Sequence, residues 1–113
     1  MNYGHFDELN KEYVITRPDT PSAWANYLGD PEYGAIISNN AGGYSFVKSG
    51  ANGRVIRYRF NGVGTDTPGR YVYLRDLETN DYWSASWAPV CKPLDQFKSE
   101  CRHGTAYTVI TSE

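Results

Sequence analysis

Short runs of strand-forming residues, separated by turn residues every few positions, are the feature that most constrains how this chain can fold. Eight such runs can be marked along the sequence, and no segment repeats its apolar residues at the helical period. The runs are rich in Val, Ile, Tyr, Phe, Trp and Thr, which suit a pleated, half-buried surface. The predicted strands are residues 12–17, 32–38, 43–49, 54–60, 70–76, 82–89, 97–104 and 107–113.

The residues between these runs predict antiparallel hairpins. Asn52-Gly53 is a signal for a two-residue hairpin turn, and Pro68-Gly69 suits the two central positions of a β-turn. Residues 21–29 can hold one helical turn at most. The run over 32–38 is apolar on both alternating faces, which predicts an interior strand. Because 113 residues predict one domain at most, the pattern indicates an all-β, antiparallel β-sandwich.

The net charge and the first residues of the sequence limit the kinds of partner that the chain is expected to bind. The formal net charge is −2, which is not the basic footprint of a nucleic-acid-binding protein. The opening stretch "MNYGHFDELNK" lacks the basic and apolar regions of a signal peptide. No apolar run approaches the about 18 residues that a membrane-spanning helix needs. We therefore expect a cytoplasmic protein with neither a nucleic-acid nor a membrane partner.

The sequence offers little catalytic or metal-binding chemistry. Cys91 and Cys101 are the two cysteines, and in a reducing compartment they are expected to be free thiols. Cys101 and His103 alternate onto one strand face, but this pair supplies too few ligands for a metal site. There is no nucleophile elbow and no glycine loop of the phosphate-binding type. We expect no catalytic residue, no metal and no cofactor in this chain.

Residues 39–43, "NNAGG", separate two predicted strands and admit two interpretations. In the first they are a hairpin connection, in which Asn and Gly supply the positive φ values that such a loop needs. In the second, the side chains of Asn39 and Asn40, or the exposed glycine backbone, face a polar ligand. Amide groups both donate and accept hydrogen bonds, so they match sugar hydroxyls.

A second aromatic-rich stretch, "YWSASWAP", occupies residues 82–89. Trp83 and Trp87 lie four positions apart and would share one face of a strand, with Tyr82 in the opposite phase. Two rings on one face can stack against a sugar, and they can equally be part of a core or of an interface. Trp83, Trp87 and Tyr82 are therefore candidate sugar contacts, together with Asn39 and Asn40.

Asp76 is the carboxylate in this part of the chain that lies in phase with apolar strand residues. A carboxylate on an apolar face needs partners, so Asp76 is expected to accept hydrogen bonds where the strand ends. Nothing in the sequence pairs it with a second carboxylate, as glycoside hydrolysis requires.

Longer motifs carry a family resemblance along the whole chain. The stretches are "GHFDELNKEYVITRPDTP", "YGAIISNNAGGYSF", "RYVYLRD", "YWSASWAPV" and "ECRHGTAYTVITSE". They resemble the N-terminal part of the cellobiose phosphorylases of glycoside hydrolase family 94, formerly grouped as glycosyltransferase family 36. The AGGYS and YLRD motifs also recur in related chitobiose and cellodextrin phosphorylases, so they mark the family.

The resemblance implies an architecture and a reaction. Such enzymes carry an N-terminal β-supersandwich, a helical linker and an (α/α)6 barrel that holds the general-acid Asp and the phosphate site. Phosphate attacks the anomeric carbon with inversion, so that cellobiose and phosphate give α-glucose 1-phosphate and glucose. Residues 1–113 would then be the N-terminal half of a supersandwich that lacks the barrel and is not catalytic alone.

The resemblance also implies partners. In the parent enzyme this domain packs on the barrel and joins a homodimer, and alone it would bind a β-glucoside sugar weakly or not at all. The alternation of Tyr107, Val109 and Thr111 runs to the last residue, so further strands are expected to cover this one. Two alternatives stay open: a free-standing sugar-binding module, and a structural or dimerisation domain without a ligand.

Overall fold

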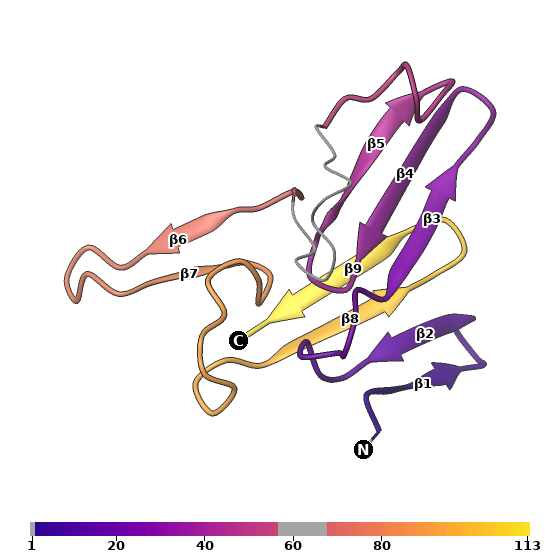
Figure 1. Ribbon diagram of the computed structural model, residues 1–113. Coiled ribbons are helices and arrows are strands. Elements are labelled where there is room, and N and C mark those ends of the chain that lie inside the picture. The colour runs from indigo at the N-terminus through magenta and orange to yellow at the C-terminus, as the bar shows by residue number, and fades with distance from the viewer. Residues whose placement is uncertain (1, 57–67) are drawn as a thin grey trace.

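The computed structural model describes residues 2–56 and 68–113, which form nine strands and no helix (Figure 1). Every strand pairing among these residues is antiparallel. The predicted all-β, antiparallel class is therefore confirmed. The strands are β1 (Gly4–Asp7), β2 (Glu12–Ile15), β3 (Ala25–Gly29), β4 (Tyr33–Ser38), β5 (Gly43–Val47), β6 (Tyr73–Arg75), β7 (Tyr82–Ser84), β8 (Ser99–His103) and β9 (Thr108–Ser112).

Three sheets are present in the described residues. A four-stranded sheet has the order β1-β2-β8-β9, a three-stranded sheet has the order β3-β4-β5, and β6 and β7 form a separate hairpin. β4 lies between two partners, as predicted for an interior strand. β9 pairs with β8 alone and is an edge of its sheet. In Figure 1 the β6–β7 hairpin extends away from the other two sheets.

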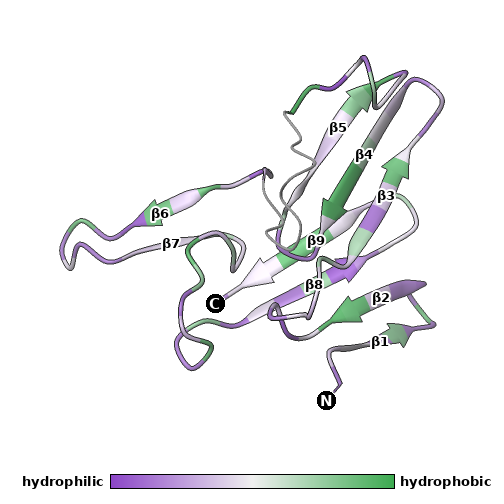
Figure 2. Cartoon of the chain, viewed as in Figure 1, coloured by the Kyte–Doolittle hydropathy of each residue, from purple (hydrophilic) through white to green (hydrophobic). Residues whose placement is uncertain are grey.

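The apolar core is concentrated on β2 and its neighbour β8. Val14 and Ile15 are each 1% exposed, and Cys101 opposite Ile15 is also buried. Because successive side chains of a strand point to opposite faces, two adjacent buried residues mean that both faces of β2 are covered. Figure 2 shows this hydropathy pattern, with the strongest apolar colour on β2 and β4.

Polar contacts join the three-stranded sheet to the four-stranded sheet. The Asn26 Nδ2 of β3 donates a hydrogen bond to the Gly104 carbonyl at 2.8 Å, beside the β8–β9 turn. His103 Nε2 lies 2.9 Å from the Trp24 carbonyl. These contacts hold the start of β3 against the end of β8.

The β6–β7 hairpin is attached through its base. The Ala85 N–H donates to the Val72 carbonyl, and the Ser112 hydroxyl of β9 donates to the Ala85 carbonyl at 2.7 Å. On the other side, Gly69 bridges to Gly42, and the chain then continues into β6. The base of the hairpin is thus held by β9 and by the loop between β4 and β5, while Lys92 pairs with Asp81 near its tip.

Two strands were missed by the sequence analysis. Residues 21–29 were allowed one helical turn at most, and residues 25–29 instead form β3 and pair in register with β4. β1 was not predicted either, and it pairs with β2. Both segments contain Gly together with Ala, Asn or Asp, which are poor strand formers, so strand partners rather than propensity determine their conformation.

Two other boundaries differ from the predictions. The reversal after β5 is closed by a hydrogen bond from the Val47 N–H to the Gly53 carbonyl, so it is wider than the two-residue turn predicted at Asn52-Gly53. Of the predicted strand over 54–60, Arg54 pairs with Phe46 as an isolated bridge, and residues 57–60 lie outside the described residues.

Candidate functional site

The Asn39–Gly43 segment is a tight hairpin loop between β4 and β5. The Ala41 N–H donates to the Ser38 carbonyl at 3.0 Å, and the Ser38 N–H donates to the Gly42 carbonyl at 2.9 Å. The left-handed residue of the loop is Ala41, with φ of 63°, rather than either asparagine. This is a three-residue hairpin loop, with a turn followed by a left-handed residue. The hairpin interpretation is confirmed, but the asparagines do not supply its positive φ.

The side chains of Asn39 and Asn40 are buried and point toward the segment that joins β2 to β3. Asn39 Oδ1 accepts from the Trp24 N–H at 3.1 Å, and its Nδ2 donates to Thr20 Oγ1 at 3.0 Å. Asn40 Nδ2 donates to the Pro18 carbonyl at 2.9 Å. Both amides therefore clamp the connection between β2 and β3 against the loop. Their contact with a sugar stays a prediction.

A second segment of backbone, residues 68–70, approaches this loop closely, and a Cβ on Gly69 would lie 2.5 Å from the Ala41 carbonyl oxygen. The Gly43 N–H donates to the Pro68 carbonyl, and the Arg70 N–H donates to the Ala41 carbonyl. A Cβ on Gly43, whose φ is 110°, would lie 2.2 Å from the Ile36 carbonyl oxygen. Glycine at this loop is therefore explained by close backbone contacts within this chain.

The tryptophans of the second candidate site do not share a strand. β7 ends at Ser84, and Trp87 lies in the turn region that follows, where its Nε1–H donates to the Lys92 carbonyl at 2.7 Å. Trp83 lies opposite Leu74 in the hairpin. The predicted strand over 82–89 is therefore too long, and the expected common face of Trp83 and Trp87 is wrong. Tyr82 is 58% exposed. Sugar contacts by Trp83, Trp87 and Tyr82 stay predictions.

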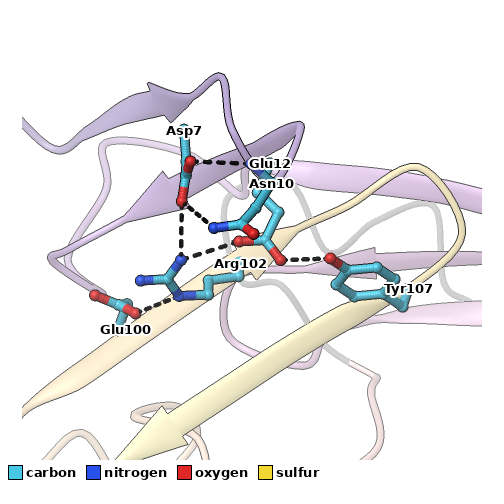
Figure 3. A network of polar contacts seen from close by, with 6 residues as sticks. All are labelled: Asp7, Asn10, Glu12, Glu100, Arg102 and Tyr107. Carbon is cyan, nitrogen blue, oxygen red and sulfur yellow. Dashed lines mark hydrogen bonds and ion pairs between the residues drawn. The ribbon is translucent and has the colours of Figure 1, made fainter.

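A polar network that the sequence analysis missed lies on the four-stranded sheet (Figure 3). Arg102 of β8 donates to Glu12 at 2.9 Å and to Glu100 at 2.7 Å, and its Nη1 lies 3.5 Å from Asp7. The Tyr107 hydroxyl donates to the other oxygen of Glu12. The residues come from opposite ends of the chain. Only the alternation of Glu100 and Arg102 on one strand face hinted at this network in the sequence.

The partners keep the carboxylates of this network ionised. The hydroxyl of Tyr107 and then the guanidinium of Arg102 lower the pKa of Glu12. The side-chain and backbone hydrogen bonds from Asn10 lower the pKa of Asp7. A carboxylate whose pKa lies below its usual range is a poor proton donor near neutral pH, so this network suits a structural role better than acid catalysis.

Asp76 has the structural role that was predicted for it. At the end of β6 its carboxylate accepts from the Glu78 N–H at 2.8 Å and from the Thr79 hydroxyl at 2.8 Å. These bonds lower the pKa of Asp76. The carboxylate stabilises the turn that joins β6 to β7.

The described residues include both cysteines and side chains of the types that can act as metal ligands. Cys91 and Cys101 are both free, as predicted, and burial raises the pKa of the Cys101 thiol to about 12. Within residues 2–56 and 68–113, no group of three or more His, Cys, Asp or Glu side chains could hold a metal ion. Those same residues contain no helix long and apolar enough to cross a membrane.

Comparison with known proteins identifies the family. Residues 11–113 match the family described as "Glycosyl hydrolase 94, supersandwich domain". The chain belongs to the glycosyl hydrolase 94 family. The resemblance noted in the sequence motifs is thereby confirmed at the level of the family, and a supersandwich domain agrees with the antiparallel sheets seen here.

The most similar relatives reported in the comparison include two N,N'-diacetylchitobiose phosphorylases. Those of Vibrio proteolyticus and Vibrio furnissii are 54% and 55% identical to this glycosyl hydrolase 94 chain over 108 residues, which is 96% of the chain. A solabiose phosphorylase of Paenibacillus borealis is 30% identical over 94% of the chain. The chain spans 13% of the length of each Vibrio relative and 14% of the Paenibacillus one.

Proposed function

We propose that this chain is part of the non-catalytic β-supersandwich domain of an inverting phosphorylase that acts on a β-linked disaccharide. The observation that carries the proposal is the family match over residues 11–113. In the proposed reaction, phosphate displaces one sugar from the other and a sugar 1-phosphate forms. The work of the present chain is to support and position the catalytic part of the enzyme.

The proposed substrate is N,N'-diacetylchitobiose, ahead of cellobiose. Two relatives named for the former share 54% and 55% identity with the chain. Relatives named for solabiose and for a glucosyl-glucuronide share 30% and 36%. Cellobiose, the disaccharide suggested by the sequence motifs, is the second candidate.

The carboxylates support a role without acid–base catalysis. Each described carboxylate with a resolved pKa shift has its pKa lowered by hydrogen bonds or cations: Asp7, Glu12, Asp19, Asp30, Asp76 and Asp81. An inverting phosphorylase needs a carboxylic acid that is protonated at working pH. We infer that this acid and the phosphate site lie in the barrel of the parent enzyme.

The β6–β7 hairpin is the surface that we assign to contact with that barrel. It exposes large apolar side chains, among them Tyr73 at 62% and Leu77 at 84%. A two-stranded hairpin is marginally stable by itself, so such side chains gain most from a partner. The parent enzyme is proposed to be a homodimer.

The proposal is tested on the complete product of the gene that encodes this chain. We expect that product, mixed with phosphate and N,N'-diacetylchitobiose, to release a sugar 1-phosphate, and to act more slowly on cellobiose. The 113-residue chain assayed alone should release none. Phosphorolysis by the isolated chain, or its absence with both disaccharides in the complete protein, would contradict the proposal.

A free-standing sugar-binding module is the second candidate function. The exposed ring of Tyr82 favours it, since an aromatic face open to solvent can stack on a sugar. Binding of a sugar to Tyr82, Trp83 and Trp87 in the isolated chain is the result that would support this candidate.

A further inference from the structure

A crevice between the four-stranded sheet and the start of β3 has no role in the functions discussed so far. It consists of two shallow, open hollows of about 530 and 480 Å³. Tyr13 and His103 line both hollows, so the two adjoin each other. Phe6 lines the larger hollow, and Trp24 and Asn26 line the smaller one.

Aromatic rings run along this crevice. The Phe6 and Tyr13 rings have centroids 4.8 Å apart and cross at 75°. The Tyr13 and Trp24 rings lie 6.0 Å apart and cross at 59°. Phe6 is 77% exposed, although it is a large apolar side chain. Three rings from β1, β2 and the segment before β3 thus present an apolar wall with one ring open to solvent.

Uncharged polar groups lie beside the rings. Because a carbonyl can only accept, His103 Nε2–H donates to the Trp24 carbonyl, and Nδ1 then accepts from the Thr108 hydroxyl at 2.9 Å. Burial lowers the pKa of His103, which favours the neutral ring. The imidazole is therefore a fixed and uncharged part of the wall.

Two further polar atoms of the smaller hollow are available to a ligand. The Asn26 Nδ2 is held by the Gly104 carbonyl, which orients the amide. Within the described part of the chain, no hydrogen bond uses Asn26 Oδ1 or the Tyr13 hydroxyl. Asn26, Tyr13 and Trp24 line this hollow together, so the amide oxygen and the hydroxyl belong to residues that border it.

We propose that this crevice binds a neutral saccharide. A sugar ring presents C–H groups on its faces and hydroxyls around its rim, which matches aromatic faces beside uncharged hydrogen-bonding groups. Anionic ligands such as phosphates are disfavoured, because Asp7, Glu8 and Glu12 outnumber Lys11 in the lining. The inference rests on the proposed function only for the choice of probe sugars.

The test is a titration of the ¹⁵N-labelled chain with N,N'-diacetylchitobiose and with cellobiose, followed by NMR. We expect saturable shifts of the Trp24 indole and of the Tyr13 and His103 amides, with a Kd of about 1 mM or weaker. Shifts confined to Trp83 and Trp87, or no saturable shift with either sugar, would overturn the proposal. Larger shifts with tetramethylammonium would also overturn it, by making the crevice a cation site.

Two substitutions separate ligand contact from folding. Phe6→Ala removes the most exposed ring of the crevice and Tyr13→Phe removes the free hydroxyl, so each is expected to weaken sugar binding about five-fold or more. The matched control is Leu9→Ala, in the adjacent turn, where an apolar residue that is 91% exposed does not line the hollows. Unchanged affinity in both variants, with melting temperatures equal to that of the control, would contradict the proposal.

These outcomes are distinct from those of the phosphorolysis assay. If the isolated chain does not bind sugar, the crevice proposal fails. The activity of the complete enzyme is still decided by the phosphorolysis assay alone. A complete enzyme that fails to phosphorolyse either disaccharide would reject the proposed function, while saturable shifts at Trp24 would still support the crevice as a saccharide site.

Discussion

The four-stranded sheet and the β6–β7 hairpin are built from similar residue types, yet they use them differently. In the sheet, Val14 and Ile15 are almost completely buried, and Arg102 gathers carboxylates from three places in the sequence. In the hairpin, Tyr73, Leu74 and Tyr82 are strand residues as well, and all three are exposed.

The sheet and the hairpin differ in how many neighbouring strands their members have. β2 lies between β1 and β8 and is covered on both faces, whereas β6 has β7 alone beside it in the described part of the chain. Alternating apolar residues predict a strand in both places, but they do not determine whether its faces are covered. The following predictions test this comparison.

The largest effect is expected in the core of the four-stranded sheet. Ile15→Ala should lower the free energy of unfolding by ~2–5 kcal/mol, because it leaves a cavity beside Cys101. Leu74→Ala in the hairpin should cost less than about 1 kcal/mol, since Leu74 is partly exposed. Urea denaturation measures both. If Ile15→Ala does not fold, Ile15→Val is compared with Leu74→Ala instead. Equal losses of unfolding free energy at the two sites would contradict the difference between the sheet and the hairpin.

Asn39 tests whether the buried turn depends on its amide. Asn39→Ala removes hydrogen bonds to Trp24 and Thr20 and leaves a backbone N–H unpaired, which should cost ~1–3 kcal/mol. Asn52→Ala, at an exposed turn position, is the control and should change stability by less than about 0.5 kcal/mol. If Asn39→Ala leaves the urea midpoint unchanged, the hydrogen bonds of the Asn39 side chain are not needed for stability.

A smaller, pH-dependent effect is expected from Glu12. Its pKa is lowered from the ordinary value of 4.5, so its contribution to stability is present above that pH and is lost as the pH falls through the folded-state pKa. Glu12→Gln should therefore be less stable than the parent chain near pH 7, and the two urea midpoints should converge as the pH falls through the lowered pKa of Glu12. Parallel midpoint curves between about pH 7 and pH 3 would exclude this ion network as the source of acid sensitivity.

The smallest effect on stability is expected at the tip of the hairpin. Leu77→Ser replaces a residue that is 84% exposed and should change the free energy of unfolding by less than about 0.5 kcal/mol. If the hairpin contacts the barrel, the same substitution in the complete enzyme should lower its melting temperature. A substantial loss of stability in the isolated chain would mean that Leu77 packs within this chain.

The sequence by itself determined the all-β class, the antiparallel hairpins and the family. Short runs of strand-forming residues marked β2, β4, β5, β8 and β9, and Asn and Gly marked the loop between β4 and β5. These features are local, because strand propensity and turn chemistry act over a few residues. The role of Asp76 could be predicted for the same reason, since its partners are two and three residues away.

The tertiary structure alone decided which side chains meet. β1 and β3 form because β2 and β4 supply hydrogen-bonding partners, although their own residues are weak strand formers. The Arg102 network joins residues 90 and 95 positions apart, and the Tyr13–Trp24 crevice depends on where β3 meets β8. Trp87 leaves the strand phase because the chain turns after Ser84. Contacts between residues distant in sequence depend on sheet pairing, which no local pattern encodes.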